Sequence, residues 1–359
     1  MIDFIPLEDY FPLFINGALI ILLFTLLHNM VLDFNSDRNL KYINFIGPIV
    51  VIFLIFYIGL RPVSGKYFVD MRTYANHFYG YANGGDIKTE KDLVFHYFMK
   101  FCSSFMSVHS FFLVCAIIYL YPMYRVSKVF FKKYWFYSFL TLVASFSFWT
   151  YGVNGIRNGM ATSLFLLGLS YQKKIGITYI IFLISFLFHK TLILPILAYT
   201  LSLLYNNPKV FFKFWLAAIP FSLVLGGFFT SIFTALGFGD DRLEAYLSND
   251  GGTSFRFDFV IYSASAVYTA WYFVIKKKFK DKVYYHLVNT YLISNAFWIL
   301  VIRANFSNRF AYLSWFMMGL VIIYPFIKAE ITNKNVKIGK VMFLYFAFTY
   351  FMVYIYYAD

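Results

Sequence analysis

The sequence predicts an all-α polytopic membrane protein with about 12 transmembrane helices (10–12 allowing for ambiguous segments), some of them short or broken. The first observation is composition: the 359 residues are 61% hydrophobic and 24% aromatic, with a mean hydropathy of +0.66. The second is that apolar runs of roughly 15–20 residues recur along the whole chain, close to the length that crosses ~30 Å of hydrocarbon as a helix. We therefore expect a single transmembrane domain over residues 1–359.

The expected spans are the longest apolar runs of the chain. They cover residues 13–32, 43–60, 108–124, 135–151, 157–172, 177–188, 191–205, 214–236, 258–275, 284–302, 309–327 and 341–357. As one helix, residues 177–205 would extend ~43 Å at about 1.5 Å per residue. We therefore expect two short helices that meet at His189 and Lys190; the alternative is one tilted span whose Lys190 reaches the headgroups.

The charge of the connecting segments alternates along the chain and predicts the orientation. Six segments hold 19 of the 31 Lys and Arg residues but only 4 of the 17 Asp and Glu residues: 33–42, 125–134, 173–176, 206–213, 276–283 and 328–340. By the positive-inside rule these segments are cytoplasmic, which places the N-terminus outside. The net charge of +14 is then an orientation signal, and no nucleic-acid partner is needed to explain it.

Arginines are distributed differently from lysines. Of the nine arginines, only Arg38 and Arg125 lie in those basic segments. The other seven lie on the predicted outer side or at its membrane boundary: Arg61, Arg72, Arg157, Arg242, Arg256, Arg303 and Arg309. A guanidinium grips phosphate or carboxylate with two parallel hydrogen bonds, so this set favours an anionic ligand near the outer leaflet. The alternative is that they anchor headgroups or pair with local acids such as Asp70, Asp241 and Asp258.

The strongest local signal is the stretch "NGIRNGMATS" around Arg157. Gly155, Gly159 and Ser163 recur every four residues and predict a seam of small residues for close helix packing. Asn154, Arg157 and Asn158 fall on an adjoining stripe of the same helix. An arginine in the first turn of a helix, beside its unpaired N–H groups, favours an anion.

Two predicted outer segments are long enough to carry function. Residues 61–107 mix aromatic side chains with charged ones, and the part from Glu90 to Phe105 is expected to form an amphipathic helix at the interface. Residues 237–257 are polar and contain several glycines. Aromatic rings stack on sugars, although Tyr and Trp are also common at membrane interfaces.

Five motifs occur in order along the chain: "GLRPVSGKYFVDMRTY", "NGIRNGMATSLFLLGL", "FLFHKTLILPILAY", "RLEAYL" and "NRFAYLSWFM". In this order they resemble the EpsG-type, Wzy-like exopolysaccharide and O-antigen polymerases of bacterial envelopes, over roughly residues 40–330. In that family the arginine of the helix start, a histidine and outer-loop Asp and Arg residues recur in this order. The histidine is usually followed closely by Ser or Thr, whereas here Lys190 intervenes before Thr191.

The resemblance implies a GT-C-like glycosyltransferase bundle in the bacterial cytoplasmic (inner) membrane. Such enzymes join glycan repeat units carried on undecaprenyl pyrophosphate at the outer face, with the lipid pyrophosphate as leaving group. The partners it implies are that lipid-linked oligosaccharide, membrane lipid, a chain-length regulator and a flippase. We expect no cofactor and no metal, since arginines can replace the electrostatic role of a cation.

The reaction needs a group that stabilises the departing pyrophosphate and a base near the acceptor hydroxyl. We expect Arg157, with Arg61, Arg303 and Arg309, to hold the pyrophosphate. The base is His189 or Asp70. The remaining expected substrate contacts are Arg72, Arg242, Tyr246, Asn154, Asn158 and Lys190.

Two other functions fit part of the pattern. A flippase or transporter of lipid-linked oligosaccharide also needs cations for a pyrophosphate, but it favours an internal repeat and basic residues deep in several spans. A membrane-bound acyltransferase often has a buried histidine, but its acyl donor is cytoplasmic, whereas His189 is predicted to face outward.

Overall fold

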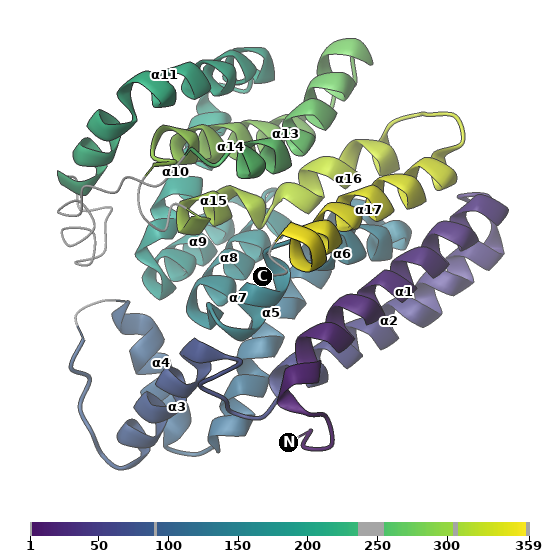
Figure 1. Cartoon of the computed structure of the whole chain (residues 1–359). Helices are drawn as coiled ribbons and strands as arrows, with labels where there is room; N and C mark the ends of the chain where they lie inside the picture. The colour runs from purple at the N-terminus through teal and green to yellow at the C-terminus, as the bar shows by residue number, and fades with distance from the viewer. Residues whose placement is uncertain (1, 90–91, 236–254, 304–307, 357–359) are drawn as a thin grey trace. The chain divides into compact units, whose positions relative to one another are not determined.

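A computed structural model describes residues 2–89, 92–235, 255–303 and 308–356 of the chain (Figure 1). All regular secondary structure in these ranges is helical, which confirms the predicted all-α class. Of the predicted site residues, Arg242 and Tyr246 lie outside the described ranges, together with most of the predicted loop 237–257.

The chain divides into two compact units, and each is described by itself. The first comprises Met1–Leu192 with Phe326–Asp359, and the second comprises Ile193–Pro325. A single transmembrane domain over the whole chain stays a prediction.

The first unit packs helices that follow one another in the chain and helices that are far apart in it. Its helices are α1 (Tyr10–Val31), α2 (Asp37–Gly59), α3 (Val69–Ala82), α4 (Leu93–Ser103), α5 (Val108–Phe131), α6 (Trp135–Val143), α7 (Phe148–Val153), α8 (Ile156–Ser170), α9 (Ile175–Phe188) and α17 (Lys334–Phe351). Helix α8 packs against both α5 and α9, α1 packs against α17, and α3 packs against α4. The α8–α9 contact is close because a Cβ on Gly168 would lie 2.5 Å from the ring of Phe182. Ser185 of α9 also donates a hydrogen bond to the carbonyl of Ala161, at 2.7 Å.

The second unit contains the following helices: α10 (Ile193–Leu204), α11 (Pro208–Ala235), α13 (Phe257–Trp271), α14 (Lys282–Leu300), α15 (Asn308–Trp315) and most of α16 (Met318–Lys328). A buried polar cluster around Asn295 of α14 joins four of them. Trp215 donates to the side-chain carbonyl of Asn295 at 2.7 Å, and the amide of Asn295 donates to Ser263 and Ser314. Because buried polar groups must find partners, this cluster fixes how α11, α13, α14 and α15 pack.

Seven helices are long and apolar enough to cross a membrane among the residues that the structure describes. They are Leu7–Val31, Asp37–Gly59, Val108–Val143, Pro208–Phe229, Phe257–Lys276, Arg309–Lys328 and Lys334–Tyr356. Ile175–Phe188 and Lys190–Leu204 are apolar but shorter. The expected apolar segments lie largely on helices, but some are short: α8, at 15 residues, extends only ~22 Å. These findings fit a multi-pass membrane protein, while the number of about twelve spans and the GT-C-like arrangement stay predictions.

The helix break at His189 is confirmed. Helix α9 ends at Phe188, His189 has extended backbone angles (φ −155°, ψ 112°), and a 3-10 turn follows over Lys190–Leu192. The alternative of one continuous tilted helix is therefore wrong. The expected amphipathic helix from Glu90 to Phe105 is also found, as the shorter α4.

Candidate functional site

The centre of the candidate site is Asp92, the residue that directly precedes α4. Its backbone is left-handed (φ 49°, ψ 43°), a conformation that aspartate tolerates better than most residues. At this position the carboxylate could cap its own helix, but it makes no such bond. Only 6% of Asp92 is exposed, so its oxygens must find partners elsewhere in the first unit.

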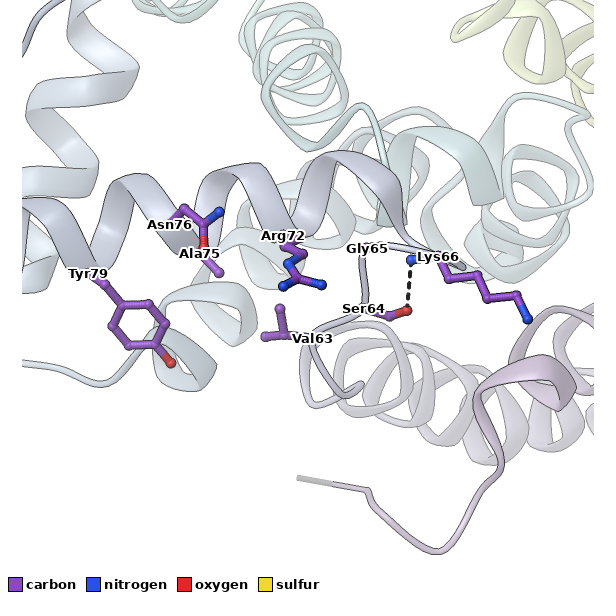
Figure 2. A pocket seen from close by; sticks show the side chains of 8 residues that line it. All are labelled: Val63, Ser64, Gly65, Lys66, Arg72, Ala75, Asn76 and Tyr79. Atoms are coloured by element: carbon purple, nitrogen blue, oxygen red, sulfur yellow. Dashed lines mark hydrogen bonds between the residues drawn. The ribbon is translucent and has the colours of Figure 1, made fainter.

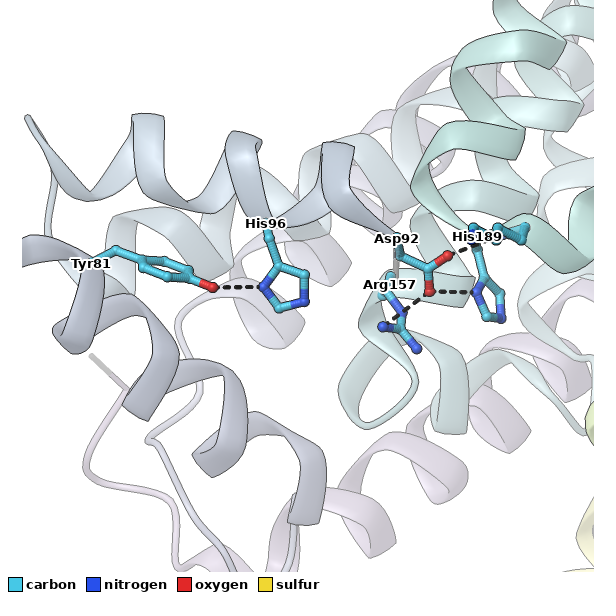
Figure 3. A network of polar contacts seen from close by, with 6 residues as sticks. Tyr81, Asp92, His96, Arg157 and His189 are labelled. Carbon is cyan, nitrogen blue, oxygen red and sulfur yellow. Dashed lines mark hydrogen bonds and ion pairs between the residues drawn. The ribbon is translucent and has the colours of Figure 1, made fainter. Parts of the chain in front are cut away.

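Those partners come from two other helix ends (Figure 3). One oxygen, Oδ2, lies 3.0 Å from Nη1 of Arg157 and 3.1 Å from Nδ1 of His189. The other, Oδ1, accepts a hydrogen bond from the backbone N–H of Lys190 at 3.1 Å. One carboxylate therefore joins the start of α4, the first turn of α8 and the two residues that follow α9.

The charge state of Asp92 determines which ring nitrogen of His189 is the donor to it. Burial raises the pKa of Asp92, but the hydrogen bond and charge of His189, the charge of Arg157 and the N–H of Lys190 outweigh it, so the pKa is lowered. An ionised carboxylate can only accept hydrogen bonds. Nδ1 of His189 must therefore be the donor. In the neutral form of the ring, this leaves Nε2 as a proton acceptor.

Both side chains held by Asp92 keep some access to their surroundings. The side chain of Arg157 is 30% exposed and that of His189 is 18% exposed, against 7% for Asp92. Arg157 uses Nη1 for the ion pair, and its guanidinium carries further N–H donors on Nε and Nη2. Helix α8 also begins without a side-chain cap. An anion could therefore bind Arg157 while the ion pair stays intact.

A second group of titratable side chains lies beside the first, on α3 and α4. Tyr81 and Nδ1 of His96 are hydrogen-bonded at 2.9 Å (Figure 3), and the ring of His77 meets that of His96 edge-on at 5.6 Å. Burial, followed by the charges of His77 and Arg157, lowers the pKa of His96 to about 4. Burial chiefly raises the pKa of Tyr74 to about 12. Both groups are therefore neutral near pH 7 and add no charge to the Asp92 group.

The two asparagines predicted around Arg157 lie where α7 gives way to α8. The amide of Asn158 donates to the hydroxyl of Tyr151 at 3.3 Å. The side-chain oxygens of Asn154 and Asn158 and the hydroxyl of Thr191 are buried and make no hydrogen bond among the described residues. Unpaired buried acceptors are costly in a folded protein, and sugar hydroxyls are donors that could satisfy them.

Arg61 occupies a different environment from Arg157. It is 1% exposed, and it donates to the carbonyl of Val153 at 2.8 Å and to that of Ile58. Its guanidinium also lies over the rings of Phe68 and Phe112. These contacts tie the end of α2 to the end of α7, which is a structural role. Its contact with pyrophosphate stays a prediction that this packing does not favour.

The other predicted residues of the first unit lie apart from the Asp92 contacts. Asp70 is exposed in the first turn of α3 and makes no hydrogen bond or ion pair within the described ranges. Arg72, two residues further along α3, lines a separate pocket. The side chain of Lys190 is exposed, and its backbone is what binds Asp92.

The remaining arginines belong to the second unit. Arg256 forms a bidentate pair with Asp258, at 2.9 and 2.6 Å, which is the ion-pair alternative raised for these arginines. Arg303 is exposed and donates to the carbonyl of Leu223 at 3.3 Å. Arg309 is exposed in the first turn of α15. The contacts of Arg303 and Arg309 with pyrophosphate stay predictions.

Sequence reasoning missed Asp92 and His96. The only local signal for Asp92 is an acid just before an amphipathic helix, in "KTEKDLVFHYF", and that position is also typical of an ordinary helix cap. Among the described residues, no three His, Cys, Asp or Glu side chains are grouped as metal ligands would be.

The family model of the EpsG family matches residues 44–359 of the chain, a range that contains Asp92, Arg157 and His189. No curated protein and no solved structure matches the chain.

Proposed function

The chain belongs to the EpsG family of Wzy-like, exopolysaccharide polymerase-type proteins, and from this premise we propose that it polymerises lipid-linked glycan repeat units. The substrate class is an oligosaccharide on undecaprenyl pyrophosphate. The reaction is glycosyl transfer with the lipid pyrophosphate as leaving group, at the outer face of the bacterial cytoplasmic membrane.

The observation that carries this proposal is the Asp92–His189 pair. Because the ionised Asp92 accepts from Nδ1, the ring of His189 is oriented, and in the neutral form of the ring Nε2 carries the lone pair. A histidine held in this way by a carboxylate acts as a general base. His189 is therefore the base, and Asp92 is the residue that positions it.

Arg157 supplies the second requirement, a fixed positive charge. The Asp92 ion pair at 3.0 Å holds the guanidinium beside His189 and beside the start of α8. Preorganised cations stabilise a charge that develops in the transition state more effectively than mobile ones, because they need no reorganisation. Arg157 is placed to bind the pyrophosphate as it departs.

The proposed transfer moves one proton, forms one bond to the anomeric carbon and breaks another. His189 Nε2 takes the proton of the acceptor hydroxyl, and that oxygen forms a bond to the anomeric carbon of the donor glycan. The bond from the anomeric carbon to the pyrophosphate oxygen breaks, and its electron pair leaves with the pyrophosphate. The unpaired oxygens of Asn154 and Asn158 are candidate acceptors for sugar hydroxyls.

The orientation in the membrane rests on loop charge. The six basic segments hold 19 of the 31 Lys and Arg residues, and Arg157 and His189 belong to the opposite set of helix ends. This places the Asp92 group on the outer side, where lipid-linked repeat units are presented for polymerisation.

The test is the purified full chain in lipid nanodiscs with a synthetic undecaprenyl-pyrophosphate repeat unit. We expect a ladder of products from the wild type, and its loss in Arg157→Ala and His189→Ala. Arg38→Ala is the matched control, because Arg38 is an exposed arginine on the predicted cytoplasmic side. No ladder from the folded wild type, or normal ladders from both site variants, would refute the proposal.

The flippase alternative needs a different readout. In liposomes that carry the labelled lipid in one leaflet, a flippase exposes the label on the other side without forming a longer glycan. A polymerase lengthens the glycan and leaves the lipid in its leaflet.

A further inference from the structure

A pocket separate from the Asp92 group lies between α3 and the loop that precedes it (Figure 2). Its volume is about 350 Å³, which lies at the lower end of the range for small-ligand sites. The loop side is formed by Ser64, Gly65 and Lys66, and the helix side by Arg72, Asn76 and Tyr79. Neither the proposed transfer reaction nor the family match assigns a role to this pocket.

The loop wall is held in a defined shape. The hydroxyl oxygen of Ser64 accepts hydrogen bonds from the backbone N–H groups of Lys66 and Tyr67, at 3.2 and 3.1 Å. Ser64 is 8% exposed, and its own hydroxyl proton makes no hydrogen bond to a described residue. The Ser64 side chain therefore holds the loop in one conformation, and its hydroxyl can donate a hydrogen bond to a ligand.

Gly65 brings the loop and the helix together. A Cβ at this position would lie 2.6 Å from Cδ of Arg72, so only glycine leaves room for the arginine to lie across the loop. The guanidinium of Arg72 lies beside the loop wall, near Val63, whereas the side chain of Lys66 extends away from it (Figure 2). One cation, Arg72, therefore lines this part of the pocket.

The charge of the pocket is uncompensated. Its lining contains Lys66 and Arg72 but no aspartate or glutamate. Arg72 makes no ion pair with a carboxylate in the part of the chain that the structure describes. The ammonium of Lys66 lies over the face of the Tyr67 ring, at 5.1 Å. An arginine without a local acid favours an anionic ligand.

Beyond Arg72, the residues of α3 that line the pocket are uncharged. Asn76 lies one turn after Arg72 on α3, and Tyr79 follows one turn later, so amide and phenol groups continue the same face. An amide hydrogen-bonds sugar hydroxyls, and an aromatic ring packs against the apolar face of a sugar. The order along α3 is thus cation, amide, aromatic ring.

We propose that this pocket binds an anionic saccharide: its carboxylate or phosphate pairs with Arg72, and its sugar ring lies against Asn76 and Tyr79. The proposal rests on the proposed function, in that the ligand is an acidic residue of the glycan being polymerised. Helix α3 packs against α4, whose first residue follows Asp92. The pocket thus holds the glycan next to the elements that carry the transfer site, and it selects repeat units that bear a negative charge.

The test is a binding measurement on the full chain in nanodiscs with four probes. The probes are a disaccharide that contains a uronic acid, a phosphorylated disaccharide, a neutral disaccharide of the same size, and inorganic phosphate. We expect either charged disaccharide to bind at least about tenfold more tightly than the neutral one, since hydrogen bonds to charged groups are the strong ones. Free phosphate should bind more weakly than the charged disaccharides, because it cannot use Asn76 and Tyr79.

Two variants test the residues. Arg72→Gln should weaken the preferred charged disaccharide about tenfold or more. Gly65→Ala should weaken it as well, because the new Cβ displaces Arg72 without removing a charge. Lys88→Gln is the matched control, an exposed lysine of the same segment that does not line the pocket.

The outcomes separate this proposal from the transfer reaction. Equal binding of the neutral disaccharide, equal binding of free phosphate, or full binding by Arg72→Gln would overturn the pocket assignment, and the ladder assay would be unaffected by that result. The opposite result is a protein that forms no ladder but still binds the charged disaccharide in a way that depends on Arg72 and not on His189. That result would overturn the proposed function and support the pocket assignment.

Discussion

Replacing Asp92 with asparagine isolates the group on which the proposed mechanism depends. The variant keeps the size of the side chain but removes the negative charge that holds Arg157 at 3.0 Å and His189 at 3.1 Å. Asparagine can still accept from the N–H of Lys190 through its oxygen. Its NH2 group, however, is a donor where His189 now finds an acceptor.

The expected loss of stability is moderate. Removing one partner of a buried ion pair costs about 3–5 kcal/mol. The 30% exposure of Arg157 lets water solvate part of the charge that is left, so we expect about 2–3 kcal/mol for the free energy of unfolding. The thermal midpoint should fall by several degrees while the protein stays folded at 25 °C.

The expected loss of rate is larger. An amide that donates to Nδ1 favours the tautomer with a proton on Nε2, which cannot act as the base. General-base catalysis and the orientation of its histidine contribute about 10²–10⁴ in rate. The activation free energy should rise by about 3–5 kcal/mol, which exceeds the effect on stability.

The assay is the rate of ladder formation, measured per folded molecule in nanodiscs. Asp86→Asn is the matched control, because the Asp86 side chain is 93% exposed in the same segment. A rate for Asp92→Asn within threefold of wild type would refute the role of the Asp92–His189 pair. A large loss of rate in Asp70→Asn, together with a normal rate in Asp92→Asn, would assign the role of the base to Asp70.

Three further substitutions test other parts of the first unit. The pKa of His96 is lowered to about 4, so the folded protein binds fewer protons than the unfolded chain below about pH 6.5. The free energy of unfolding should therefore fall by roughly 2–3 kcal/mol between pH 6.5 and 4. His96→Gln should reduce this pH dependence in thermal unfolding measured across pH. Arg61→Met should lower the thermal midpoint by leaving two carbonyls unpaired, at a cost of about 2–4 kcal/mol, with the ladder rate per folded molecule retained; a lost rate at unchanged stability would favour a pyrophosphate contact instead. Gly159→Ala should destabilise by about 1–3 kcal/mol because its Cβ would lie 2.4 Å from the carbonyl oxygen of Tyr151, whereas Gly176→Ala, which meets open space, should not; equal thermal midpoints would contradict the packing at the start of α8.

The helical elements could be predicted from the sequence because the signals are local. Apolar length and loop charge are properties of short segments, and a backbone in hydrocarbon must satisfy its own hydrogen bonds. The break at His189 followed from helix length and the side on which the neighbouring lysines lie, and it is confirmed. The small-residue seam predicted around Gly159 agrees with the close approach of this glycine to Tyr151.

The roles of the arginines could not be separated in this way. Arg61 and Arg157 both lie at the edges of apolar runs, and the sequence pattern assigned both to pyrophosphate. In the structure, Arg61 is buried against carbonyls and Phe rings, whereas Arg157 is partly exposed and paired with Asp92. Burial depends on which helices pack together, and that information is not contained in a local pattern.

The sequence by itself therefore determined the helical class, the break at His189 and the choice of Arg157 as a candidate site residue. Each of these depends on residues close together in the chain. Only the tertiary structure revealed that Asp92 joins Arg157 and His189, which lie about 65 and 97 positions away from it. A carboxylate becomes a positioning group only when packing removes it from water and brings both partners within hydrogen-bond distance. This requirement is met only in the tertiary structure, where Asp92, an acid just before a helix, becomes the centre of the site.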